Sequence, residues 1–244
     1  MRLLLINGNR TQAVTDTALA EARRVASVGT EIVGVTAAFG ANIVSTVADN
    51  TIAQHAVLDA LARHHVGFDA VLLAISLDSG LAAARELVAI PVIGMTEAAL
   101  LTAGLLGDRF GMITFGRQST AMYLELAERY GMTRRLAACR TIETQSLTDY
   151  LDASALHERI VAEAQSTAAL PGMGSIVVCG AALAGTAHRL QSRVPLPLVD
   201  GIACAVRHAE MLVGLGLQPR RHPPVAKLDM QGITPALANL YRHS

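Results

Sequence analysis

The sequence is poor in lysine, in aromatic residues and in net charge. Only one of its 20 basic residues is a lysine, Lys227, which lies in a Pro-rich tail. Schiff-base chemistry on a pyridoxal cofactor needs a lysine held in a core pocket, so this class of enzyme is strongly disfavoured. Tryptophan is absent and aromatic residues make up 3% of the chain, which removes the usual base-stacking surface. The 20 basic residues balance 20 acidic ones, so we expect no nucleic-acid and no membrane partner.

Patterns for metal binding, disulfides and membrane insertion are also missing. Cys139, Cys179 and Cys204 show no CxxC spacing and no neighbouring histidine pair, which disfavours a zinc site and a disulfide scaffold. No run of about eighteen apolar residues occurs. The apolar run at residues 1–7 is shorter than the hydrophobic region of a signal peptide and lacks a cleavage site. We therefore predict a cytoplasmic protein without a metal site.

What is present is a regular alternation of two kinds of segment, within a chain of 52% hydrophobic residues. Short β-branched or leucine-rich runs predict strands at residues 3–7, 31–36, 70–75, 91–93, 109–114, 136–141, 175–179 and 196–199. Ala-rich amphipathic stretches predict helices at residues 11–26, 47–65, 79–88, 97–106, 118–130, 153–169, 183–192 and 201–215. This order predicts an α/β fold with mostly parallel sheets covered by helices. Ligand sites in such folds form where strand carboxyl ends meet helix N-termini.

The chain also contains an internal repeat. Residues 74–99 and 179–203 both run from a strand through a small-residue turn and a helix to a short Pro-led strand, and then to a helix that opens near an acidic residue, Glu97 or Asp200. Any two βαβ units look partly alike, but the shared proline and acidic residue favour a duplication. We predict two similar Rossmann-like lobes related by a pseudo-twofold axis, with the site in the cleft between them.

The predicted boundaries follow from this repeat. The first lobe comprises residues 1–94 and 198–217, the second comprises residues 95–197, and residues 218–244 form a C-terminal extension. The extension contains prolines that cannot continue a helix, followed by a possible short helix at residues 233–241. It is either an arm that packs on a partner subunit or a loosely ordered terminus.

Polar residues follow several of the predicted strands, and each has a functional and a structural interpretation. Asn7, Asn9 and Thr11 suit a carboxylate or an imide, or they cap the first helix. Ser76 and Asp78 suit acid–base chemistry, although Asp78 also suits a helix cap. Thr114 and Arg117 suit an anion, whereas Arg117 also suits a solvated first helical turn.

The order and spacing of these segments resemble the Asp/Glu/hydantoin racemase superfamily, and within it the hydantoin and allantoin racemase branch. The resemblance extends to about Leu217 and rests on residues 6–9, 37–40, 78–86, 91–94, 97–99 and 197–201. It implies a cofactor-independent racemase, epimerase or isomerase that transfers a proton at the carbon next to a carbonyl. The implied substrates are small hydantoin-, allantoin- or dicarboxylate-like molecules, the implied assembly is a homo-oligomer, and Phe39 corresponds to a cleft-lining aromatic.

The sequence departs from this family at the catalytic thiols. Ile75 occupies the position of the first family cysteine, and both the count back from Pro197 and the internal repeat place Gly180 at the second. Cys179 is one residue early, and such a slip directs a strand side chain to the opposite face. Two-thiol racemisation therefore cannot operate here as it does in the family. Four alternatives remain open. Either Cys179 acts alone, or other groups take over, or the chain is a decarboxylase or other lyase, or it binds a ligand without turnover.

These considerations define the candidate residues. The candidates for catalysis are Cys179, Asp78 and Ser76, and we expect Cys179 to line the site without replacing the family's pair. The candidates for substrate binding are Asn7, Asn9, Thr11, Phe39, Ile75, Gly80, Thr96, Thr114, Arg117, Gly180 and Ala181.

Overall fold

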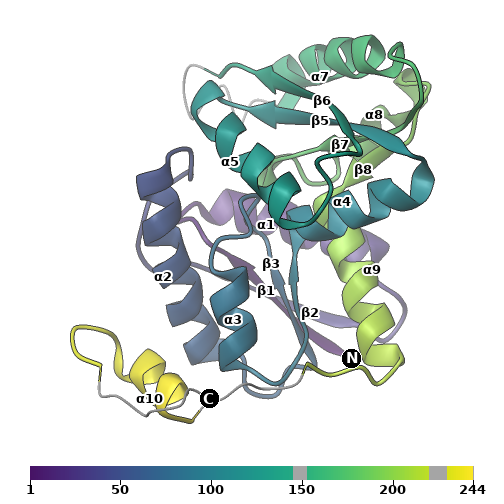
Figure 1. Ribbon diagram of the computed structural model, residues 1–244. Coiled ribbons are helices and arrows are strands. Elements are labelled where there is room, and N and C mark those ends of the chain that lie inside the picture. The colour runs from purple at the N-terminus through teal and green to yellow at the C-terminus, as the bar shows by residue number, and fades with distance from the viewer. Residues whose placement is uncertain (145–152, 220–229, 244) are drawn as a thin grey trace.

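The computed structural model describes residues 1–144, 153–219 and 230–243, and it contains two four-stranded sheets (Figure 1). Their strand orders are β2-β1-β3-β4 and β6-β5-β7-β8, and every pairing is parallel. The same order occurs twice, which confirms the predicted α/β fold of two similar lobes. The strands are β1 (Arg2–Asn7), β2 (Glu31–Thr36), β3 (Ala70–Leu73), β4 (Val92–Gly94), β5 (Arg109–Phe115), β6 (Leu136–Ile142), β7 (Met173–Val178) and β8 (Leu198–Asp200).

Helices connect the strands and cover both faces of each sheet. The predicted helix at 183–192 is interrupted near its start, because Gly185 adopts a left-handed conformation with φ of 80° between residues 181–183 and residues 186–190. No helix in the described part of the chain is both long and apolar enough to cross a membrane. The helices are α1 (Gln12–Val25), α2 (Val47–His64), α3 (Leu81–Leu87), α4 (Met95–Leu106), α5 (Arg117–Arg129), α7 (Ala153–Ala168), η1 (Ala181–Leu183), α8 (Thr186–Leu190), η2 (Gln191–Arg193), α9 (Gly201–Gly214) and α10 (Pro235–His243).

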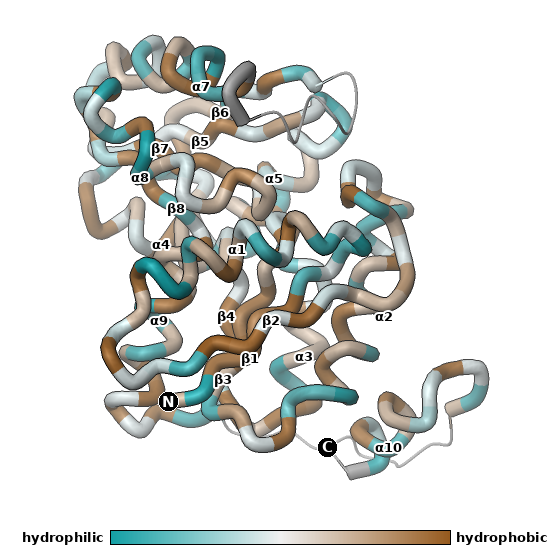
Figure 2. The backbone as a smooth tube through the Cα atoms, turned by 180° about the vertical axis from the view of Figure 1, so that it is seen from behind, coloured by the Kyte–Doolittle hydropathy of each residue, from teal (hydrophilic) through white to brown (hydrophobic). Residues whose placement is uncertain are grey.

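The central strand β1 shows why the strand sequences are continuously apolar. Leu3 and Leu5 pack in one cluster with α1 and α9, whereas Leu4 and Ile6 pack in another with α2 and α3. All four side chains are fully buried because helices cover both faces of the parallel sheet. Figure 2 shows the resulting hydrophobic segment at β1, inside the lobe.

Two helices are exchanged between the lobes. Helix α4 follows β4 of the first sheet, but its Leu100 and Ala103 pack with Phe110 of the second lobe. Helix α9 follows β8 of the second sheet, but Ile202 and Val206 pack in the core of the first lobe. The predicted lobe boundary between residues 197 and 198 needs correction, because residues 198–200 form β8 and hydrogen-bond to β7. The crossing into the first lobe comes after Asp200.

The C-terminal helix α10 packs against α2 of the same chain (Figure 1). Leu237 and Leu240 enter the core of the first lobe, and the Thr234 hydroxyl donates a hydrogen bond to the buried carboxylate of Asp59. This part of the extension is therefore a packed element of the first lobe and not a loose terminus. Residues 220–229, including Lys227, lie outside the described residues.

We predict that replacing Leu240 with alanine lowers the free energy of unfolding by about 2 kcal/mol, since a buried leucine loses its apolar contacts. The matched control is Asn239→Ala, because Asn239 is the exposed neighbour on the same helix. Urea unfolding of both variants measures the difference. Equal stability of the two variants would contradict the docking of α10 on α2.

Candidate active site

The carboxyl ends of both sheets face a common cavity of about 830 Å³ between the lobes. Segments that follow β1, β2 and β3 form the wall from the first lobe, and segments that follow β5, β6 and β7 form the wall from the second. This is where the duplicated fold predicts the site. The lining residues are Asn9, Val14, Asn42, Ile43, Val44, Ser45, Ile75, Ser76, Leu77, Phe115, Gly116, Arg117, Gln118, Ser119, Tyr123, Glu143, Thr144, Ala181 and Ala182.

After β1, a network of amide hydrogen bonds fixes the orientation of Asn9. The buried Asn7 Nδ2 donates to Asn9 Oδ1 at 3.0 Å, and the Thr11 backbone N–H donates to the same oxygen at 2.9 Å. Asn7 Oδ1 in turn accepts from the Asn9 backbone N–H at 3.1 Å. Asn9 lines the cavity with 8% of its surface exposed, and no bond from its Nδ2 occurs among the described residues. Asn9 can therefore donate to a ligand, while Asn7 serves to orient it.

Thr11 is directed away from the cavity. Its hydroxyl donates to the Asn42 carbonyl oxygen at 2.7 Å, and it makes no side-chain cap of α1. The structure thus places Thr11 in the support of the loop after β2 and not in the cavity wall.

After β3, Ile75 and Ser76 both line the cavity. Ile75 packs closely over Gly8, where a Cβ atom would lie 2.6 Å from Ile75 Cδ1. The Ser76 hydroxyl accepts a hydrogen bond of 2.8 Å from the Gly180 backbone N–H. This bond joins the two lobes at the cavity wall.

Cys179 lies in the core. The Ala74 N–H donates to Ile6 O, and the Cys179 N–H donates to the equivalent Ile113 O, so the two sheets align Ala74 with Cys179 and Ile75 with Gly180. The Cys179 side chain is 2% exposed and packs with Met112 in the core, outside the set of residues that line the cavity. Burial raises the pKa of its thiol well above the ordinary value. The expectation that Cys179 lines the site is corrected accordingly, since one residue of offset directs its side chain to the other face.

The neighbouring residues of the second lobe carry little chemistry. Gly180 has no side chain and a φ of 104°, whereas Ala181 contributes a methyl group to the cavity wall. The position that aligns with Ile75 therefore supplies only a backbone N–H.

Asp78 is buried behind the cavity wall. Its carboxylate is 2% exposed and accepts hydrogen bonds from the backbone N–H groups of Thr96 at 3.1 Å and Glu97 at 2.8 Å. The Tyr130 hydroxyl donates a third bond of 2.8 Å. Burial raises the pKa of Asp78 to about 7, although the three donors favour its ionised form. Asp78 does not line the cavity, and Thr96 is likewise buried, with its hydroxyl bound to the Ser76 carbonyl oxygen.

Three other predicted residues also lie away from the cavity. Thr114 is fully buried and hydrogen-bonds to the Arg140 carbonyl oxygen within the sheet. Phe39 makes an edge-on ring contact with His55 of α2 at 5.0 Å. Gly80 precedes α3 in a left-handed conformation with φ of 77° and borders a separate groove between α2, α3 and α5.

The rim of the second lobe contains an ion pair, of which Arg117 is predicted from the sequence and Glu143 is not. Arg117 begins α5, and its Nε lies 3.0 Å from an oxygen of Glu143, which follows β6. Glu143 obeys the same rule that identifies Ser76, because it is a polar residue directly after a strand, whereas Ser45 lies just before α2 and far from the end of β2. Tyr123 has a weaker signal, since it is one helical turn after Ser119 on α5.

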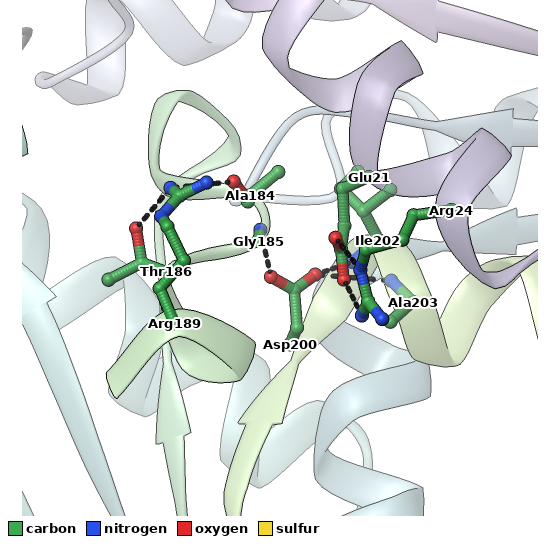
Figure 3. A network of polar contacts seen from close by, with 9 residues as sticks. All are labelled: Glu21, Arg24, Ala184, Gly185, Thr186, Arg189, Asp200, Ile202 and Ala203. Atoms are coloured by element: carbon green, nitrogen blue, oxygen red, sulfur yellow. Dashed lines mark hydrogen bonds and ion pairs between the residues drawn. The ribbon is translucent and has the colours of Figure 1, made fainter. Parts of the chain in front are cut away.

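The second lobe has its own buried carboxylate (Figure 3). Asp200 accepts from the N–H groups of Ile202 and Ala203 at the start of α9 and from the Gly185 N–H at 2.7 Å. Burial raises its pKa. Both helices open near an acidic residue as predicted, but at different positions: the strand register aligns Asp200, the residue before α9, with Gly94, whereas Glu97 lies in the first turn of α4. Glu97 instead forms an ion pair with Arg85.

Across the described ranges, no group of three His, Cys, Asp or Glu side chains could hold a metal ion. The candidate site thus consists of amides, hydroxyls, one ion pair and apolar side chains.

The fold and this cavity define an α/β protein of two duplicated lobes with its candidate ligand site between the ends of two parallel sheets. The model of the Asp/Glu/Hydantoin racemase family matches residues 3–209, and the chain belongs to this family. It is a racemase-type protein, that is, an isomerase-type enzyme.

Relatives cover nearly the whole chain. A hydantoin racemase of Rhizobium meliloti is 30% identical over 217 residues, which are 88% of this chain and 90% of that protein. An allantoin racemase from Klebsiella pneumoniae has a TM-score of 0.88 and 32% identity over 97% of this chain and 98% of its own. The allantoin racemase from Pseudomonas fluorescens has a TM-score of 0.87 and 33% identity, over 93% of this chain and 99% of its own.

We predict that Cys179 reacts with iodoacetamide more slowly than Cys139 and Cys204, because only Cys179 is fully buried. Replacing Cys179 with alanine should lower the free energy of unfolding by about 1 kcal/mol and leave turnover unchanged. Mass spectrometry of the labelled native protein ranks the three thiols. Rapid labelling of Cys179 that a substrate blocks would place this thiol in the cavity after all.

Proposed function

We propose that this chain is a cofactor-independent racemase-type enzyme for a small cyclic ureide, such as a hydantoin or allantoin, that works without a cysteine pair. The observation that carries the proposal is the composition of the cavity wall. Ile75, which aligns with Gly180 of the second lobe, lines the cavity together with the amide of Asn9, the hydroxyl of Ser76 and the carboxylate of Glu143.

The lining residues favour an uncharged substrate with an apolar substituent. Arg117 and Glu143 are the only charged residues among the described lining residues, and they neutralise each other. A dicarboxylate would need further cations, which supports a ureide over it. Ile75, Leu77 and Phe115 provide apolar surface for a substituent.

Proton transfer can begin at Glu143, which is the only carboxylate among the described lining residues. Glu143 takes the proton from the carbon next to the carbonyl, and the C–H electron pair moves onto the carbonyl oxygen. The Asn9 amide donates a hydrogen bond to that oxygen, which gains negative charge. A solvent proton delivered on the face lined by Ser76 gives the opposite enantiomer, and Glu143 returns its proton to solvent.

A second candidate is a small-molecule binding protein that does not turn its ligand over. The absence of any thiol from the described cavity wall favours it. The two candidates differ in one measurable respect, since only the enzyme exchanges the substrate's carbon-bound proton with solvent.

The deciding experiment incubates enantiopure 5-substituted hydantoins and allantoin with the protein in D₂O. The enzyme incorporates deuterium at the chiral carbon and loses optical rotation, as NMR and polarimetry measure. Saturable binding without deuterium incorporation would overturn the enzymatic proposal and support the binding protein. If the protein neither binds these compounds nor exchanges their proton, the ureide substrate class is overturned.

We predict that Glu143→Gln lowers the exchange rate by at least about 10²-fold, the typical contribution of a positioned general base. The matched control is Glu158→Gln. Glu158 lies on α7, away from the cavity, and forms a comparable ion pair with Arg193. Deuterium incorporation under saturating substrate gives both rates. Equal rates would exclude Glu143 as the base.

A further inference from the structure

A single side chain of the second lobe is anchored in the first lobe behind the cavity. Tyr130 follows the last residue of α5, and its ring packs against apolar clusters of both lobes. Its hydroxyl donates a 2.8 Å hydrogen bond to Asp78 Oδ2. This bond spans 52 residues of sequence and connects the end of α5 to the loop after β3.

Both partners of this bond belong to elements that also form the cavity wall. Ser76 and Leu77 immediately precede Asp78 and line the cavity from the first lobe. At the other end of α5, Arg117, Ser119 and Tyr123 line it from the second lobe. The position of Tyr130 on Asp78 therefore constrains where the two walls stand relative to each other.

The loop leaves Asp78 little freedom. Asp78 has a φ of 46°, the only positive value among described residues other than glycine. A Cβ atom at Gly94 would lie 2.5 Å from Asp78 Cγ, so the carboxylate fills the space that Gly94 leaves open. The N–H groups of Thr96 and Glu97 also donate hydrogen bonds to the carboxylate oxygens of Asp78. A residue kept in such a conformation depends on the surrounding contacts.

We propose that Asp78 and Tyr130 are positioning residues, which hold the two walls of the cavity in register through an ionised carboxylate. The proposal rests on the proposed racemase function and assigns neither residue a contact with the substrate. It predicts that breaking the bond lowers kcat more than it changes KM, because both walls remain but stand in altered positions.

Protonation of Asp78 should weaken its bonds to the Thr96 and Glu97 N–H groups as well as to Tyr130, so an acid limb should persist when Tyr130 is replaced. Burial raises the pKa of Asp78 to about 7, so its carboxylate loses an acceptor site below about pH 7 and kcat should fall there. Tyr130→Phe removes one donor to the ionised form, so the pKa should rise further and the acid limb of the kcat profile should move to higher pH. The charged or titratable groups around Asp78 are Arg85, Glu86, Glu97, Glu125, Arg129, Tyr130 and Cys179.

The same shift has a consequence for stability. Because the pKa of folded Asp78 lies above its ordinary value of 3.8, its ionisation opposes folding. The contribution of Asp78 to stability is therefore fully present below about pH 4 and is lost as the pH rises through 7.

The test compares Tyr130→Phe with the matched control Tyr241→Phe, which removes a hydroxyl from α10, away from the cavity. The two measurements are kcat and KM for deuterium exchange across pH, and the ¹³C NMR titration of the Asp78 carboxyl, assigned with Asp78→Asn. We expect Tyr130→Phe to lower kcat by about tenfold or more with KM nearly unchanged. We also expect the acid limb of the kcat profile and the midpoint of the NMR titration to move to higher pH. Tyr241→Phe should match the unmodified protein in both.

The NMR titration keeps this proposal separable from the proposed function. If no hydantoin or allantoin is turned over, the proposed function fails. A raised midpoint of the Asp78 titration in Tyr130→Phe, but not in Tyr241→Phe, still supports the bond between Tyr130 and Asp78. An unchanged midpoint in Tyr130→Phe overturns the proposal. A loss of kcat without a shift of the acid limb also overturns it, because a merely structural loss would produce that result.

Discussion

The relative placement of the two lobes depends on the N-termini of α4 and α9, each of which binds a buried carboxylate. Asp78 accepts from the first turn of α4, and Asp200 accepts from the first turn of α9. An uncompensated buried charge is costly, but the free N–H groups of a helix start satisfy it and the helix dipole favours it. Each carboxylate thereby fixes the point at which a helix leaves one sheet and crosses to the other lobe.

This exchange makes the cores of the two lobes interdependent. The first lobe contains Ile202 and Val206 of α9, and the second contains Leu100 and Ala103 of α4. Neither sheet is fully covered without a helix that starts on the other. We therefore expect both lobes to unfold in one cooperative transition, and a fragment that ends at residue 94 to lack the part of its core that α9 supplies.

Much of the fold could be predicted from the sequence because its signals are local. The apolar runs, the glycine turns and the repeat identify the strands and their order. The one-residue offset of Cys179 predicts that its side chain points into the core, because side chains alternate along a strand. The site was harder to predict because proximity to a strand end does not decide which way a side chain points. Thr114 lies at a strand end but packs elsewhere, as does Phe39, which only the family resemblance implies. Tyr130 meets Asp78 through a tertiary contact that has no local signal.

Gly180 and Ile75 occupy aligned positions, but evolution could change them with very different ease. Ile75 has ordinary backbone geometry, so an exchange for another side chain alters packing over Gly8 and in the core of the first lobe but does not strain the backbone. At Gly180 the φ of 104° disfavours every residue with a Cβ atom by about 1–3 kcal/mol, so a new side chain there also requires the turn to rearrange. A descendant of this protein could therefore gain a functional group on the first lobe by one substitution, but on the second lobe only through coupled changes.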